Sequence, residues 1–109
     1  SEGMFEVDTT GHRIALLVNE KMFQTLAQLR SITDGPEILM SSIYMPAIME
    51  VLDALRNTDQ SYEHLRWYQP FLAKCDLKGV HLEPNMSILE AAQILLERPV
   101  ARLSKLVGE

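Results

Sequence analysis

Cysteine is nearly absent from this sequence, and so are long apolar runs. Cys75 is the one cysteine in 109 residues, which excludes an internal disulfide and every cysteine-rich zinc pattern. The longest strongly apolar stretch near the N-terminus, residues 14–18, is far shorter than the roughly 20 residues that cross a bilayer, and no charged leader precedes it. We therefore expect a cytoplasmic protein without membrane contact. Residues 1–3 precede Met4, and we interpret them as an expression remnant.

Basic side chains are outnumbered, because 10 Lys and Arg stand against 15 Asp and Glu and give a formal net charge of −5. The imbalance lies in the first 50 residues, which carry seven acids and three bases. Binding to a nucleic-acid backbone depends on Lys and Arg that neutralise phosphates. Nucleic-acid binding is therefore disfavoured, and a DNA-associated regulator is only the third functional hypothesis.

Motifs for cofactors and metals are missing as well. The five glycines are scattered, so none forms a phosphate-binding loop. The histidines His12, His64 and His81 have no histidine partner at metal-binding spacing, and the acids show no calcium-loop pattern. Ser41 and Ser42 lack the flanking glycines of a nucleophile elbow. The sequence predicts no cofactor and no metal, and it disfavours an enzyme.

The chain does have the composition of a globular protein, with 47% hydrophobic and 23% charged residues, and its length predicts one domain over residues 1–109. Two short β-prone runs, residues 4–7 and 13–18, flank a polar turn and predict a β-hairpin. Asn19 is a suitable N-cap for an amphipathic helix over about 20–32. Its apolar residues recur every three to four positions: Met22, Phe23, Leu26, Leu29 and Ile32.

A second helix is predicted from Asp34 to Arg56. Asp34 is an acidic cap, Pro36 suits the first turn, and Glu37 has the spacing to bond back to the cap. Pro46 should kink or split this helix, because proline lacks a backbone donor and crowds the preceding turn. The alternative is a strand over residues 38–45 that leads into a helix from Pro46.

The C-terminal half predicts two further helices and a short terminal one. The third spans about 61–77 and ends at Gly79; residues 80–82 are then a connector or a short strand. The fourth spans about 86–97, with a capping box of Ser87 and Glu90. Its wide apolar face predicts that it is the central element, with Ile88, Ala92 and Leu95 in the core. A terminal helix over 100–107 follows.

Together these patterns predict an α+β fold, mainly α, with four to five helices and a short N-terminal β-hairpin packed on them. The terminal helix carries three basic residues, Arg98, Arg102 and Lys105. Their positive charge suits a helix C-terminus, so a solvated face is favoured over a contact with an acidic partner.

Five residues are candidates for a pocket between the third and fourth helices: His64, Trp67, Tyr68, Cys75 and His81. On one helix, His64 and Cys75 would be separated by about 16 Å at roughly 1.5 Å rise per residue, too far for a catalytic pair. Cys75 can meet His81 only if the chain turns back at Gly79. A buried, inert Cys75 and a core Trp67 are the favoured interpretations.

The second helix carries more apolar surface than one core-facing stripe needs. Ile38, Met45 and Met49 lie off its main apolar face, and methionine is favoured at adaptable contact surfaces. We therefore expect a non-enzymatic interaction or oligomerisation module that binds a second copy as a homodimer, or another protein. The alternative is a small-molecule-binding protein or a small enzyme.

Overall fold

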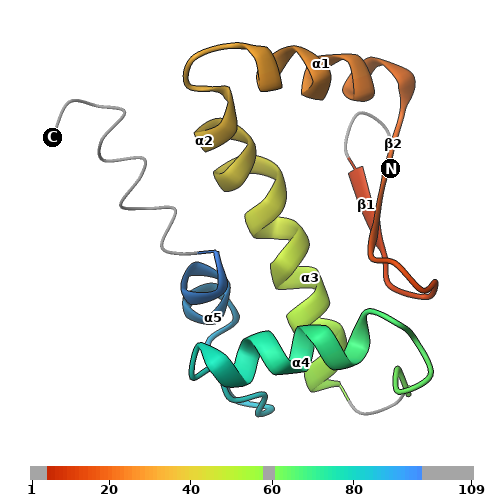
Figure 1. Cartoon of the computed structure of the whole chain (residues 1–109), viewed down its shortest axis with the longest axis vertical. Coiled ribbons are helices and arrows are strands. Elements are labelled where there is room, and N and C mark those ends of the chain that lie inside the picture. The colour runs from red at the N-terminus through yellow and green to blue at the C-terminus, as the bar shows by residue number, and fades with distance from the viewer. Residues whose placement is uncertain (1–4, 58–60, 97–109) are drawn as a thin grey trace, which may run out of the picture.

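The computed structural model describes residues 5–57 and 61–96, and it has the predicted mainly α, α+β architecture. A two-stranded hairpin precedes helix α1, a long helix divided into α2, a π-helical turn and α3, and two shorter helices (Figure 1). The predicted terminal helix over 100–107 and its three basic residues lie outside the described part of the chain.

The hairpin forms where its β-prone runs predicted it. Strand β1 (Phe5–Asp8) pairs antiparallel with β2 (Ala15–Val18). The turn is held by Asp8, whose Oδ1 accepts hydrogen bonds from the Thr10 amide at 2.9 Å and the Thr10 hydroxyl at 2.6 Å. These bonds favour the carboxylate and lower the pKa of Asp8.

Helix α1 (Glu20–Ser31) begins as predicted, because Oδ1 of Asn19 accepts a hydrogen bond from the Met22 amide at 2.7 Å. The chain then turns sharply into α2 (Gly35–Leu39). A Cβ on Gly35 would lie 1.4 Å from the carbonyl oxygen of Leu29, so only glycine fits this corner. The expected cap at Asp34 is wrong: its side chain makes no capping bond, because its backbone (φ −100°, ψ 10°) is not extended as an N-cap requires.

The strand alternative for residues 38–45 is also wrong, because the chain is helical from Gly35 to Arg56. Residues Met40–Tyr44 form a π-helical turn between α2 and α3 (Met45–Arg56). There the Met45 amide donates to the carbonyl of Met40, five residues back, and Pro46, which has no N–H to offer, lies in the first turn of α3. The wider turn lets the helix pass the proline without breaking.

Helix α3 is the central element, and it separates two hydrophobic clusters. The first core cluster lies between α3, α4 (Tyr68–Leu77) and α5 (Ile88–Leu95) and includes Leu52 and Ala92, both with no exposed surface. The second core cluster contains fully buried Val51 together with Tyr62, Leu65 and Trp67, and the hairpin packs against it. Consecutive positions on a helix point about 100° apart, so Val51 and Leu52 serve different clusters.

The prediction that α5 is central is therefore wrong, although its core residues Ala92 and Leu95 are buried. Ile88 is only partly buried, and Leu89 is 51% exposed, because α5 packs along one side of α3 and leaves the rest of its wide apolar face in solvent. The Ser87 half of the predicted capping box is present: the Ser87 hydroxyl accepts a hydrogen bond from the Glu90 amide at 3.2 Å.

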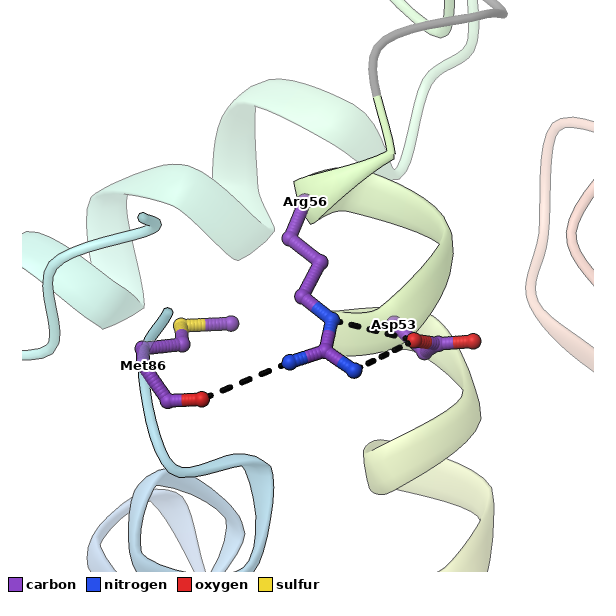
Figure 2. Close-up of polar contacts among 3 residues, drawn as sticks. All are labelled: Asp53, Arg56 and Met86. Carbon is purple, nitrogen blue, oxygen red and sulfur yellow. Dashed lines mark hydrogen bonds and ion pairs between the residues drawn. The ribbon is translucent and has the colours of Figure 1, made fainter. Parts of the chain in front are cut away.

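Arg56 ties the end of α3 to the segment that leads into α5 (Figure 2). Its Nε donates to Asp53 Oδ1 at 3.0 Å, and its Nη1 donates to the carbonyl of Met86 at 3.4 Å. The ion pair between Arg56 and Asp53 is partly solvated and contributes little to the stability of the fold by itself. The bond to Met86 connects residues 30 positions apart and links the end of α3 to the segment before α5.

Among the described residues, Gly35–Arg56 is the one helix with the length and composition of a membrane span. It supplies buried residues to both core clusters, as the core helix of a soluble protein does. Length and composition alone are weak evidence for a membrane, and the placement is compatible with a soluble protein.

Candidate functional site

The end of α4 brings two of the five predicted pocket residues together. Gly79 adopts φ +74°, and the amides of Gly79 and Val80 donate to the carbonyls of Asp76 and Cys75 at 3.1 and 2.8 Å. This is a Schellman ending, which only glycine adopts without strain. It turns the connector back along α4, so that Cys75 and His81 line the same hollow.

The hollow lies between α4 and the connector that follows it. The sequence predicted a pocket between the third and fourth helices, and the hollow lies next to that position. Residues 80–82 are irregular, which resolves the choice between connector and strand. Nine residues line it: Gln69, Leu72, Ala73, Cys75, Asp76, Val80, His81, Leu82 and Glu83. Among the described residues, no three His, Cys, Asp or Glu side chains are placed to hold a metal ion.

Cys75 is buried, as predicted, with 2% of its surface exposed. Burial, and then the negative charge of neighbouring Asp76, raise the pKa of the thiol. Nucleophilic cysteines need the thiolate and an electropositive setting, and here both influences favour the neutral thiol. The geometry of Cys75 is that of a core residue whose edge reaches the hollow.

The other three pocket candidates do not reach this hollow. The predicted helix over 61–77 begins only at Tyr68, and residues 63–67 form turns. His64 is therefore exposed before the helix and does not share a stripe with Cys75.

Pro70 does not kink α4, because it is the third helical residue, where a backbone N–H has no intrahelical partner.

Trp67 anchors the second core cluster. Its ring centroid lies 5.5 Å from that of Tyr62 and 6.2 Å from those of Tyr68 and Phe71, and its Nε1 donates to the carbonyl of Thr9 at 3.2 Å. Such tilted and edge-on contacts stabilise aromatic clusters. The Arg66 amide adds a hydrogen bond to Nδ1 of His12 at 3.2 Å. Trp67 therefore packs the hairpin onto the helices.

Of the three residues predicted for an interface, the structure leaves one exposed. Met45 belongs to the first core cluster, Met49 packs against that cluster, and Ile38 is 37% exposed. Helices α4 and α5 meet this side of α3, so the chain itself covers the two methionines. Self-association through Ile38, Met45 and Met49 as one surface therefore lacks two of its three contacts.

Helix α1, predicted as an amphipathic helix over about 20–32, lies at the surface. None of its 12 residues is buried, and no α1 side chain belongs to, or packs against, either core cluster. Its apolar residues nonetheless gather on one side, here called the α1 stripe: Met22, Phe23, Leu26 and Leu29. Phe23 is 62% exposed. In Figure 1, α1 lies at the opposite end of the long helix from α4 and α5.

Charged residues flank the α1 stripe at its two ends. Glu20 lies in the first turn and Arg30 in the last, where each charge complements the helix dipole. Ile32 and Ile38 extend exposed apolar surface past the corner at Gly35. The arrangement is an amphipathic helix whose stripe the described part of the chain covers only in part: Met22, Leu26 and Leu29 are half-buried, and Phe23 is exposed.

Comparison with known proteins adds no relative: no family description, no curated protein and no solved structure matches the chain.

Proposed function

We propose that the chain is a non-enzymatic interaction module that forms a homodimer through the α1 stripe. The observation that carries the proposal is the incomplete burial of the α1 stripe: Phe23 is 62% exposed, the other three residues are only half-buried, and α1 contributes no residue to either core cluster. An isolated helix of 12 residues is marginal in water, and most helices in proteins owe their stability to packing of the apolar face. Here the chain buries that face only in part, and a partner surface supplies the rest.

A second copy covers this face when the two α1 helices pair antiparallel. When two α1 helices pair antiparallel about a twofold axis near Leu26, Phe23 of one lies opposite Leu29 of the partner subunit. The same pairing brings Glu20 toward Arg30 of the partner subunit, and it sets the two helix dipoles antiparallel. Parallel pairing would instead place like charges side by side.

Mass measurement across a concentration series tests the proposal. The unmodified chain should change from monomer to dimer in sedimentation or light scattering. Leu26→Lys, which places two lysines at the twofold axis, should raise the dissociation constant about 30-fold or more, the factor for the roughly 2 kcal/mol of a hot-spot side chain. Its circular dichroism should keep α3, α4 and α5 folded, because Leu26 touches neither core cluster.

The matched control is Leu77→Lys, on α4, where the leucine is 84% exposed and remote from α1. It should leave the dimer unchanged. Met45→Lys should instead unfold the protein, because it forces a charge into the first core cluster. A chain that stays monomeric at millimolar concentration, or a Leu26→Lys variant that dimerises as before, refutes the proposal. Assignment of the protein to the cytoplasm stays a prediction.

A further inference from the structure

Two hydrogen bonds, here called the hairpin clasp, fasten the loop of the hairpin, residues 9–14, to the segment before α4, residues 61–67. The indole Nε1 of Trp67 donates to the carbonyl of Thr9 at 3.2 Å, and the Arg66 amide donates to Nδ1 of His12 at 3.2 Å. The two donors are consecutive residues, and the bonds join positions that are 58 and 54 residues apart. The clasp therefore connects the two halves of the chain.

The hairpin depends on such contacts for its position. Each of its strands has four residues, and a two-stranded hairpin is only marginally stable by itself in water. Val7 and Ile14 pack against the second core cluster, and the clasp attaches the loop between the strands. Loss of one clasp bond should therefore loosen the loop while the apolar packing holds the strands in place.

His12 is the half of the clasp that can titrate. A neutral imidazole has one N–H donor and one acceptor nitrogen, whereas the protonated ring has two donors and no acceptor. Because Nδ1 of His12 accepts the Arg66 amide, the bond requires the neutral ring with its proton on Nε2. Turning the protonated ring over brings a C–H group to the amide, so no orientation restores the bond. The indole of Trp67 does not titrate.

The charges on the elements around His12 balance in sign. Among the described residues, the hairpin from residue 8 to 14, the segment 61–67 and the last turn of α3 carry three acids, three arginines and one further histidine: Asp8, Asp53, Glu63, Arg13, Arg56, Arg66 and His64. Asp8 already accepts from Thr10, and Asp53 pairs with Arg56. The bond from the Arg66 amide is therefore the specific contact that differs between neutral and protonated His12.

We propose that the hairpin clasp is a pH-sensitive fastening, in which protonation of His12 breaks its bond to the Arg66 amide and loosens the hairpin loop on the segment 61–67. Histidine ordinarily changes its charge between about pH 5 and 8. The neutral ring carries the bond, so the clasp is complete at the alkaline end of this range and half open at the acidic end. The device is separate from the α1 stripe, so it holds for the Leu26→Lys monomer as well.

The test measures exchange of the Arg66 amide with solvent by NMR in the full chain at about pH 7.5 and 5.5, corrected for the intrinsic pH dependence of exchange. Protection should fall roughly two- to tenfold at the lower pH, the factor for the roughly 0.5–1.5 kcal/mol of one hydrogen bond. The fluorescence of Trp67, the one tryptophan, should shift to longer wavelength as its 8% exposed side chain gains water.

His12→Asn is the decisive variant, because the amide oxygen of asparagine takes the place of Nδ1 and accepts at either pH. It should keep the Arg66 amide protected at both pH values. The matched control is His64→Asn, at an exposed position in the same segment, which should keep the pH dependence of the unmodified chain. The inference is overturned if protection of the Arg66 amide does not change with pH, if the change persists in His12→Asn, or if His64→Asn removes it.

Discussion

Leu52 gives the most direct test of the architecture, because among the described residues it is the largest side chain with no exposed surface and it lies where α3 meets α5. Leu52→Ala removes three carbons, which cost about 2.4 kcal/mol in transfer free energy at about 0.8 kcal/mol each. A residual cavity adds to this, but Met49 and Met86 pack against the same cluster and can move into the space. We expect a loss of about 3 kcal/mol in the free energy of unfolding.

Urea unfolding followed by circular dichroism measures this loss. The midpoint should fall by roughly 1–3 M, given a slope of about 1–3 kcal/mol per molar for a small domain. All variants must be compared at one protein concentration, since dimerisation would make stability depend on it. Leu77→Ala, at the 84% exposed position on α4, is the matched control and should change little. A loss below about 1 kcal/mol for Leu52→Ala, or equal losses for both variants, would show that α3 is not central.

Two further substitutions probe local geometry. Gly35→Ala should lower the free energy of unfolding by roughly 1–3 kcal/mol, because its Cβ would lie 1.4 Å from the carbonyl oxygen of Leu29. In the control, Gly11→Ala, the nearest atom to the new Cβ lies at 3.9 Å. Equal melting temperatures for the two variants would contradict the close contact between Gly35 and Leu29. Cys75 should react with iodoacetamide far more slowly in the native protein than in urea, because its side chain is buried. The reaction rate in the native protein should rise only at a more alkaline pH than that of a free thiol, because burial raises the pKa of Cys75. Native and unfolded rates that agree would show Cys75 to be accessible.

Local signals predicted most of the elements correctly. The caps at Asn19 and Ser87 make the expected bonds, and Gly79 ends α4 as expected. Each of these signals acts within a few residues, through a side-chain oxygen and an orphan amide or through a positive φ. These caps and the glycine ending can therefore be predicted from neighbouring residues alone, without the tertiary structure.

The errors arose where tertiary contacts override the local pattern. Residues 63–67 have helical periodicity but form turns, because Tyr62, Leu65 and Trp67 are all buried in the second core cluster beside the hairpin. Trp67 also bonds Thr9, 58 positions away, and no local rule predicts such a contact. His64 therefore lies exposed in the turns before α4, whereas Cys75 and His81 line one hollow because the turn at Gly79 is local.

The candidate interface shows what periodicity can and cannot report. A stripe of apolar residues predicts that one face of a helix is covered, but it does not predict which element or partner covers it. The stripes of α1 and α3 look alike in sequence; α5 helps to bury the α3 stripe, whereas Phe23 on the α1 stripe stays exposed and its other three residues are only half-buried. The difference comes from the corner at Gly35, where close contact with Leu29 fixes α1 against the start of the long helix. Since α4 and α5 lie at the other end of the long helix, α1 contributes to neither core cluster, and we propose that a second copy of the chain covers the exposed part of its stripe.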